Sequence, residues 1–435
     1  MKNDLRPVTI FGLGYVGLPL SLSYSMKGFK VFGIDINETL VNELKAGITH
    51  LHENHGDKSI QQILQECLKS GNFLPTTDAS EALAASNKFI LTVGIPVKNE
   101  TVDYDPVISA CSTIARGLKT GDTVIIRSTL VPGTTENKLI PILESSGLKA
   151  GDDFHVVYCP ERISEGNAFY EFENVPVIIA GINSKSMSPG TKVIKMISNV
   201  DPVPVSSIKI AETAKVVENI QRDVNIAMVQ QLADFCRKLG ISIFELIQAA
   251  NTHPRVNLLK PGPGVGGYCI PNALYYLKPT ADELGVKIDL LSLSRRINHD
   301  VPDKICHRIR AALLDTGRKP SNSKVAILGI AMKDYCSDDR QSPVIDIVNT
   351  LQESGISVSA YDPCVATGHP FKTDDLSQCL LKADCLLISA VQEGINYSDF
   401  NLFKALMNEK PIIFDTRNTI NIPAAKDMGF TVISL

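Results

Sequence analysis

Residues 8–17 read VTIFGLGYVG, an apolar, β-branched run that leads directly into a glycine-rich turn. Glycine occupies the first, third and sixth positions of GLGYVG, and a helical pattern follows at once. In such a strand–turn–helix unit the first glycine permits the tight turn and the second lets a pyrophosphate approach the backbone, while the third lets helix and strand pack closely. The motif therefore predicts a dinucleotide-binding turn. Its expected members are Gly12, Gly14, Tyr15, Val16 and Gly17.

The next apolar run, KVFGID (30–35), ends in Asp35. An acidic side chain roughly 20 residues after the turn accepts a hydrogen bond from a ribose 2′-hydroxyl and would repel a 2′-phosphate. We therefore expect NAD, and not NADP, as the cofactor. A plain glycine turn followed by a solvated aspartate is the alternative reading of the same residues.

Short apolar runs alternate with amphipathic stretches in both halves of the chain, which is typical of parallel sheets with crossover helices. Between the halves, residues 206–239 form one helical pattern without internal proline or glycine. We predict an α/β fold in which two Rossmann-like, doubly wound parallel-sheet domains are joined by a central helical segment. The expected domains are residues 1–203, 204–305 and 306–435. The expected strands lie within 8–12, 30–35, 88–94, 122–129, 154–160, 324–330, 356–363, 383–390 and 411–416.

Composition excludes several classes of partner. Hydrophobic residues make up 44% of the chain and charged residues 21%, and the formal net charge is −4. Because no basic tract stands out, nucleic acid and anionic membranes are not expected partners. The ten cysteines include no CxxC pair, which favours a reducing, cytoplasmic setting. The histidine-rich stretch THLHENH (49–55) resembles a metal cluster, but we expect a solvated loop and no metal there.

The central helical pattern places Lys215, Asn219 and Asp223 four residues apart, and therefore on one face. An ordinary solvated face is the alternative interpretation. A neighbouring apolar stripe is expected to face a core or a partner helix, which makes the long helix the expected dimer interface. The stripe consists of Val217, Ile220, Val224 and Ala227.

Cys269 follows a glycine run in GPGVGGYC (262–269). A lone cysteine is often a small buried hydrophobic residue, but glycines of this density bring the backbone close to another group. A thiolate combined with a lysine and a carboxamide is suited to oxidising an aldehyde through a covalent thioester. The sequence thus predicts a second chemical function beside the dinucleotide site.

Seven motifs, in order along the chain, resemble the UDP-glucose/UDP-N-acetylmannosamine dehydrogenase family. They are GLGYVG (12–17), RSTLVPGTT (127–135), PERISEG (160–166), AKVVENIQRDVN (214–225), PGPGVGGYC (261–269), GIAMKDYCSDDRQSP (329–343) and FDTRN (414–418). The resemblance runs from end to end and implies a two-step, four-electron oxidation of the C6 alcohol of a UDP-sugar. It also implies that the second Rossmann-like domain binds the UDP moiety.

The resemblance implies a role for each matching residue. Cys269 would be the nucleophile, and Lys215 and Asn219 would stabilise oxyanions. Thr129 and Glu161 would position water and manage protons. Arg255 would reach the substrate of the neighbouring subunit of a homodimer. The residues matching NAD contacts are Thr129, Glu165 and Arg340; those matching substrate contacts are Glu161, Arg162, Lys215, Asn219, Arg255, Lys260, Gly266 and Lys333.

One position departs from the family pattern. An aspartate is expected four residues after the nucleophile, and this chain has Ala273 there. Asp223 or Glu161 is expected to take over its role. PERISEG, RDVN and PGPGVGG resemble the branch that oxidises UDP-N-acetylhexosamines for polysaccharide or glycoconjugate biosynthesis. UDP-glucose 6-dehydrogenase, a single-step β-hydroxyacid dehydrogenase and a non-catalytic nucleotide-sugar sensor remain the alternatives.

Overall fold

The computed structural model describes residues 6–49 and 51–435. The chain forms two compact units, and two helices pass from one to the other. The first unit contains the residues up to Glu218 together with Tyr275–Val286. The second contains Asn219–Leu274 and Lys287–Leu435.

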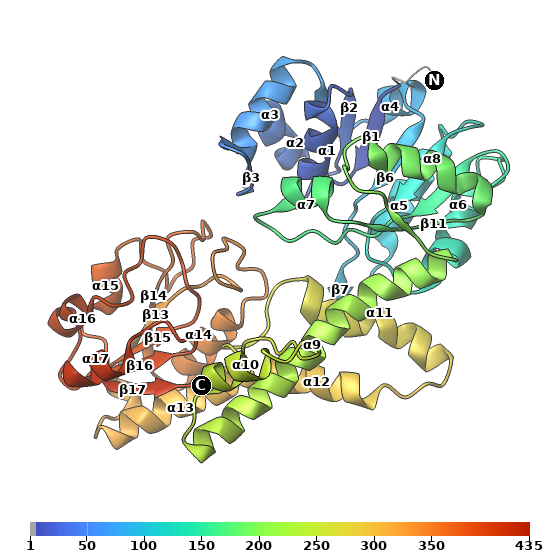
Figure 1. The fold of residues 1–435 in the computed structure, drawn as a ribbon. Helices are drawn as coiled ribbons and strands as arrows, with labels where there is room; N and C mark the ends of the chain where they lie inside the picture. The colour runs from blue at the N-terminus through green and yellow to red at the C-terminus, as the bar shows by residue number, and fades with distance from the viewer. Residues whose placement is uncertain (1–5, 50) are drawn as a thin grey trace. The chain divides into compact units, whose positions relative to one another are not determined.

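The first unit is built on an eight-stranded sheet in the order β12-β11-β10-β9-β6-β1-β2-β5 (Figure 1). All neighbouring strands run parallel except β10 and β11. The chain adds β2 and β5 on one side of β1 and then returns to place β6 on the other side, so the sheet changes direction at β1. Ligands of doubly wound sheets bind at such a switch point. The strands are β1 Val8–Phe11, β2 Val31–Ile34, β5 Phe73–Thr76, β6 Lys88–Leu91, β9 Thr123–Ile126, β10 His155–Tyr158, β11 Ile178–Gly181 and β12 Val203–Pro204, with the hairpins β3 Asn54–His55/β4 Lys58–Ser59 and β7 Val97–Lys98/β8 Thr101–Val102.

Helix α1 (Gly17–Met26) is buried over nearly its whole length, because it packs against the sheet, α3 and α7. Its three buried serines would be costly without partners. Each serine hydroxyl instead donates to the carbonyl four residues earlier, at 2.7–2.9 Å. The other helices of this unit are α2 Glu38–Lys45, α3 Ile60–Lys69, α4 Ser80–Ala85, α5 Asp105–Ala115, the π-helical turn Thr135–Leu139, α6 Ile140–Glu144, α7 Ala168–Asn174 and α8 Ser184–Lys195.

The predicted central helix is confirmed as α9 (Ile208–Leu239), a single helix of 32 residues that is unbroken in Figure 1. It is followed by α10 (Ile243–Ala250) and, after a proline- and glycine-rich loop, by α11 (Cys269–Glu283). Helices α12 (Asp289–His299) and α13 (Val301–Asp315) lead towards the C-terminal sheet.

The C-terminal sheet has five parallel strands in the order β14-β13-β15-β16-β17. Alternate residues of its strands enter two separate cores, one under α13 and α14 and the other under α15–α17. Both faces are therefore covered, as parallel sheets require, and the predicted pair of α/β sheets is confirmed. The strands are β13 Lys324–Leu328, β14 Ser357–Tyr361, β15 Cys385–Ile388, β16 Ile412–Asp415 and β17 Thr431–Ser434; the helices are α14 Pro343–Glu353, α15 Leu376–Leu380, α16 Phe400–Leu406 and α17 Ile422–Asp427, with a 3-10 turn at Pro320–Asn322.

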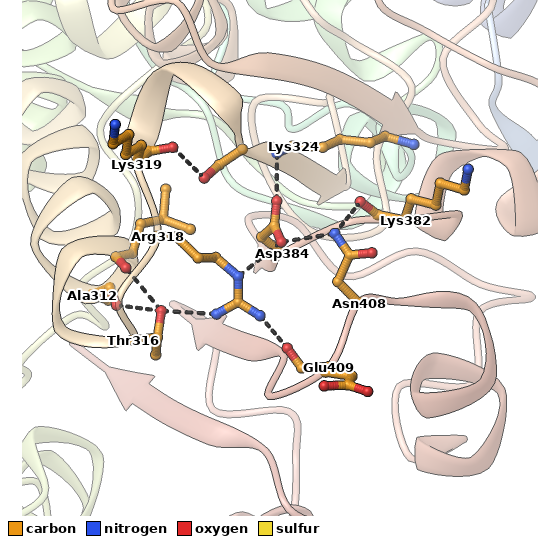
Figure 2. Close-up of polar contacts among 11 residues, drawn as sticks. Ala312, Thr316, Arg318, Lys319, Lys324, Lys382, Asp384, Asn408 and Glu409 are labelled. Atoms are coloured by element: carbon orange, nitrogen blue, oxygen red, sulfur yellow. Dashed lines mark hydrogen bonds and ion pairs between the residues drawn. The ribbon is translucent and has the colours of Figure 1, made fainter.

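A polar network fastens the connection from α13 to the amino ends of these strands (Figure 2). Asp384 accepts from Arg318 Nε, Asn408 Nδ2 and Lys324 N, each at 2.8 Å. Arg318 also donates to the Glu409 carbonyl. The network lies at the edge opposite the carboxyl ends of the strands and fastens α13 to the sheet.

Not every strand was marked by sequence. β5 includes Pro75 and β12 ends in Pro204, and proline is unusual within strands. Among the described residues, 6–49 and 51–435, no helix is both long and apolar enough to cross a bilayer.

Candidate active site

The glycine turn after β1 lies at the switch point of the eight-stranded sheet. An added Cβ at Gly17 would lie 1.7 Å from the Gly12 carbonyl oxygen, so only glycine lets α1 begin this close to the strand. Gly14 has open space where a side chain would project. The Asp35 carboxylate accepts from Leu13 N at 2.7 Å and from Asn37 N at 2.9 Å. It therefore holds the turn together while remaining only partly buried at the end of β2.

Tyr15 and Val16 of the same turn are half-buried. Beside Asp35, the apolar side chain of Ile36 is 89% exposed. Sequence reasoning missed this residue, because its only signal is its position directly after Asp35.

Thr129 lies half-buried in the loop that follows β9. Ser128 fixes one end of this loop, because its hydroxyl donates to Val93 O at 2.7 Å and its carbonyl accepts from Tyr158 Oη at 3.0 Å. Glu212 of α9 fixes the other end by accepting from Gly133 N at 2.5 Å and Thr135 N at 2.9 Å.

Glu212 is fully buried, and burial raises its pKa above the usual glutamate value. It precedes Lys215 by three residues on α9, nearly one helical turn. The helix that carries Lys215 is thus attached directly to the loop that carries Thr129. Sequence reasoning missed Glu212, because nothing in AETAK marks its distant partners.

Glu161 lies in a buried ion pair. Its Oε2 accepts from Arg127 Nη2, and its Oε1 accepts from Arg162 N at 2.8 Å and Ile163 N at 3.1 Å. Arg127 is 3% exposed and Glu161 is 8% exposed. The carboxylate is therefore an anchor for its own loop, and any exchange of protons with a water would have to occur beside these three donors.

Arg162, next in the chain, is exposed and pairs with Glu218 of α9 at 2.8 Å. Glu165 is half-buried further along the same loop. The loop that contains three of the predicted site residues therefore contacts α9 through an ion pair as well.

The Lys215, Asn219 and Asp223 row is not a solvated face: Lys215 is half-buried, and Asn219 and Asp223 are 7% and 4% exposed. Asp223 Oδ1 accepts from Arg295 Nη1 at 2.8 Å and from Asn298 Nδ2 at 2.9 Å. Burial raises the pKa of Asp223, and the Arg295 guanidinium opposes that rise. Asp223 is thus already paired with α12, through two residues that the sequence did not mark.

The neighbouring apolar stripe divides in two. Ile220 and Ala227 are buried, with exposed fractions of 5% and 2%, whereas Val217 is 46% exposed. The stripe therefore contributes only partly to the core within one chain.

Cys269 is the first residue of α11 and is exposed, whereas the other nine cysteines are buried or half-buried. The helix begins at the cysteine itself, directly after the proline- and glycine-rich loop. The first N–H groups of a helix have no partner within it, so backbone donors lie at the end of α11 that carries this thiol. An oxyanion on a carbon bonded to Cys269 Sγ could accept from them.

The glycine run before Cys269 packs against the 332–343 loop of the same unit. An added Cβ at Gly267 would lie 2.1 Å from Met332 Sδ, and its φ of +77° is unfavourable for other residues. At Gly266 a Cβ would lie 2.7 Å from Gln341 O. Gly267 N donates to Arg340 O at 3.0 Å. The cysteine is therefore held on the C-terminal domain by backbone contacts that only glycine permits.

Ala273 lies one turn after Cys269 in α11 and is 2% exposed. A carboxylate here would be buried, which is costly without paired donors. The methyl group instead contributes to packing.

Arg255 and Lys260 are exposed on the loop that follows α10. Asn225 of α9 holds this loop, donating to Asn257 O at 2.7 Å and accepting from Leu259 N at 3.0 Å. The backbone is thus anchored while both cationic side chains point into solvent within one chain.

Three family sequence models match the chain in order. The NAD binding domain of the UDP-glucose/GDP-mannose dehydrogenase family matches residues 6–199, its central domain 209–300 and its UDP binding domain 326–422. The chain belongs to this family. Membership confirms the prediction that the chain is a UDP-sugar dehydrogenase that uses NAD. It rules out the two other predictions, a single-step β-hydroxyacid dehydrogenase and a non-catalytic nucleotide-sugar sensor.

Individual relatives match most or nearly all of the chain. The UDP-N-acetyl-D-mannosamine dehydrogenase of Pyrococcus horikoshii is 34% identical over 417 residues, 96% of each chain. A UDP-N-acetyl-D-glucosamine 6-dehydrogenase of Pseudomonas aeruginosa is 34% identical over 84% of each chain. The solved structure of a UDP-D-ManNAc dehydrogenase from P. horikoshii matches with a TM-score of 0.90 at 32% identity, covering 98% of both chains.

In each sheet of this UDP-sugar dehydrogenase an aspartate follows the second strand, and the two aspartates differ in burial and in hydrogen bonding. In the NAD domain, Asp35 remains accessible. In the UDP domain, Asp362 is 1% exposed and accepts from the backbone N–H groups of Ile330, Ala331 and Cys364 at 2.7–3.0 Å. Gln392 Nε2 is a further donor to it. The carboxylate of Asp362 is therefore fully occupied by donors of its own domain, unlike that of Asp35.

Two further predicted residues lie in the UDP domain. Lys333 is exposed, and Arg340 forms a two-pronged ion pair with Asp338, at 2.6 Å and 2.8 Å. The pair orients the guanidinium while leaving its side chain 44% exposed. Both side chains are thus available to an anionic ligand.

Proposed function

We propose that this enzyme oxidises the C6 alcohol of a UDP-N-acetylhexosamine to the carboxylate through a thioester on Cys269. The observation that carries the proposal is the exposed thiol at the start of α11, held by a glycine run against the UDP binding domain. The relatives named for N-acetylmannosamine and N-acetylglucosamine substrates, at 34% identity, support the sugar class.

When bound, NAD would supply the hydride acceptor for both oxidations at C6. In the first oxidation the hydroxyl proton passes to a water positioned by Thr129 and Glu161, and the Lys215 ammonium and Asn219 carboxamide stabilise the alkoxide from which the aldehyde forms. A preformed cation and amide donor act strongly here, because they need no reorganisation when charge develops. The half-burial of Lys215 and the near-complete burial of Asn219 keep these donors in place.

Cys269 Sγ then adds to the aldehyde carbon, forming a C–S bond and an oxyanion. The oxyanion accepts from Asn219, Lys215 and the first N–H groups of α11. Loss of the second hydride leaves a thioester. Water attacks its carbonyl, the C–S bond breaks, and the acid and the free thiol are released. The whole sequence consumes one water and transfers four electrons.

Hydrolysis is the step most affected by Ala273. Both substitutes expected from the sequence are already engaged, since Asp223 pairs with Arg295 and Glu161 with Arg127. Thr129 is left as a half-buried hydroxyl able to orient a water. We therefore expect thioester hydrolysis to be slow enough for an adduct on Cys269 to accumulate.

The remaining site residues keep their proposed contacts. Gly12, Gly14 and Gly17 with Asp35 would hold the cofactor, together with Thr129, Glu165 and Arg340. On the substrate side, the exposed cations Arg162, Lys260 and Lys333 would pair with the diphosphate or donate hydrogen bonds to the sugar. Gly266 would contact the substrate through its backbone, with Glu161 shaping the loop.

A homodimer completes the proposal. The row of exposed apolar side chains on α9 includes Met228, Phe235 and Leu239, at 44%, 59% and 60% exposed. On α12, Leu290 and Leu293 are 64% and 43% exposed. Exposed apolar rows of this kind mark interaction sites. A second copy covering α9 would bring the solvent-facing Arg255 to the substrate of its partner.

The test is a panel of UDP-sugars with NAD, following NADH absorbance and product mass. Uronate from UDP-N-acetylmannosamine or UDP-N-acetylglucosamine supports the proposal, whereas exclusive turnover of UDP-glucose contradicts the sugar class. Cys269→Ser should still bind both ligands yet stall before free acid, and Cys364→Ser is the matched control. Native-rate uronate formation by Cys269→Ser would exclude the thioester.

A separate assay tests whether Arg255 serves the active site of the neighbouring subunit. Arg255→Ala and Cys269→Ala proteins should each be inactive, and mixing them should restore partial activity in hybrid dimers. If verified subunit exchange restores none, Arg255 does not act across the interface.

A further inference from the structure

The histidine-rich stretch near residue 50 contains a buried acid. Glu53 is 5% exposed, although His52 and Asn54 on either side of it are exposed. Its Oε1 accepts from Gly166 N at 2.6 Å and its Oε2 from Ala168 N at 3.0 Å. These donors are more than a hundred residues further along the chain, at the end of the PERISEG loop.

A second contact attaches the same stretch to α7. The His55 ring meets Phe169 edge-on, with centroids 5.7 Å apart. Its Nε2 lies 3.7 Å from Glu173 Oε2, and Glu173 Oε1 pairs with Lys27 at 2.8 Å. Residues 51–55 therefore lie across the start of α7 and are fixed at two points.

A carboxylate is the group that this position needs. The Ala168 N–H group is buried at the start of α7, where it has no partner within the helix, and leaving it unpaired would be costly. The Gly166 N–H group lies in the loop two residues before the helix. A carboxylate has only acceptors, so one side chain satisfies both N–H groups. A glutamine of the same size would satisfy one and turn its own NH₂ towards the other.

The loop between Glu161 and Ala168 is thus held by a carboxylate at each end. Glu161 Oε1 accepts from the two N–H groups that begin it, and Glu53 accepts from the two that end it. Between these anchors lie Arg162 and Glu165. Side chains on a loop bind precisely only if its backbone is fixed.

We propose that Glu53 is a positioning residue for the cofactor, acting through the backbone of Gly166 and Ala168 on Glu165. The inference rests on the proposed contact between Glu165 and NAD. Glu53 itself does not touch the ligand. Its loss loosens the loop in the NAD domain and leaves the UDP domain, which belongs to the other unit, unchanged.

The experiment measures NAD and UDP dissociation constants separately by titration calorimetry on the full-length enzyme. Glu53→Gln is expected to weaken NAD binding about tenfold, because one charge-assisted hydrogen bond is lost and a donor–donor contact is created. UDP binding should be unchanged. Glu53→Asp keeps the charge but reaches only one donor, and should weaken NAD binding less.

Glu144→Gln is the matched control. Glu144 also accepts from a backbone N–H, that of Ala150 at 3.1 Å, but lies half-exposed and away from the site. The NAD affinity of the Glu144→Gln variant should equal that of the native enzyme. If Glu53→Gln fails to fold, Glu53→Asp carries the same comparison.

Two outcomes overturn the proposal: native NAD affinity in Glu53→Gln, or an equal loss of NAD and UDP binding, which a merely structural role would give. The Glu165→Ala variant tests separately whether Glu165 contacts NAD, which is the premise of the proposal. If Glu165→Ala weakens NAD binding and Glu53→Gln does not, positioning by Glu53 is wrong. If neither variant weakens NAD binding, the proposed contact between Glu165 and NAD is itself wrong.

Discussion

Replacing Arg127 by methionine should destabilise the N-terminal unit strongly, because it leaves the Glu161 carboxylate buried without its cation. Both side chains are less than a tenth exposed. Breaking such a pair from one side typically costs about 3–5 kcal/mol. The Arg162 and Ile163 N–H groups still bind Glu161 Oε1, so the lower value, about 3 kcal/mol, applies. For a unit of roughly 200 residues this lowers the melting temperature by about 6–12 °C.

Differential scanning calorimetry without ligands measures the shift. The double variant Arg127→Met/Glu161→Gln should recover most of the loss, because glutamine still accepts from the two backbone groups and no charge is stranded. Lys185→Met is the control. Lys185 pairs with Asp152 at 3.0 Å, but both side chains are about two-thirds exposed, and exposed pairs contribute about 0–1 kcal/mol.

Two results would refute this reasoning. The first is a melting temperature for Arg127→Met as close to the native value as that of Lys185→Met. The second is a double variant whose loss equals the sum of the single losses, since groups in direct contact should couple.

Three further outcomes are expected. Lys215→Ala should lower turnover about 10²–10³-fold, whereas Lys238→Ala, on the exposed end of the same helix, should not; native turnover in Lys215→Ala would make it a structural residue. Asp35→Ala should narrow the preference for NAD over NADP in steady-state assays, and equal use of both cofactors by the native enzyme would contradict the role of Asp35. Because burial raises the pKa of Glu212 in the folded state, its contribution to stability is present at low pH and lost as pH rises through that pKa. The melting temperature of the native enzyme should therefore rise relative to Glu212→Gln between pH 7 and 5, and a pH-independent difference would show that Glu212 does not titrate differently on folding.

The elements that the sequence determined are those whose chemistry is local. The glycine spacing of the turn after β1, the apolar runs of the strands and the unbroken pattern of α9 each lie within one short stretch. Asp35 belongs to the same class, because its distance from the turn is set by a single strand–helix–strand unit. Cys269 was marked by the glycines directly before it.

Only the tertiary structure decided which acidic side chains are buried and hold other segments of the chain in place. Glu53, Glu161, Glu212 and Asp223 are all buried, and each accepts from at least one residue on a different strand, loop or helix. No local pattern indicates that Asp223 meets Arg295 72 residues away, or that Glu212 meets Gly133 79 residues away. A carboxylate can be buried only where donors from elsewhere in the fold converge on it. That convergence is a property of the folded chain, and no local pattern of residues encodes it.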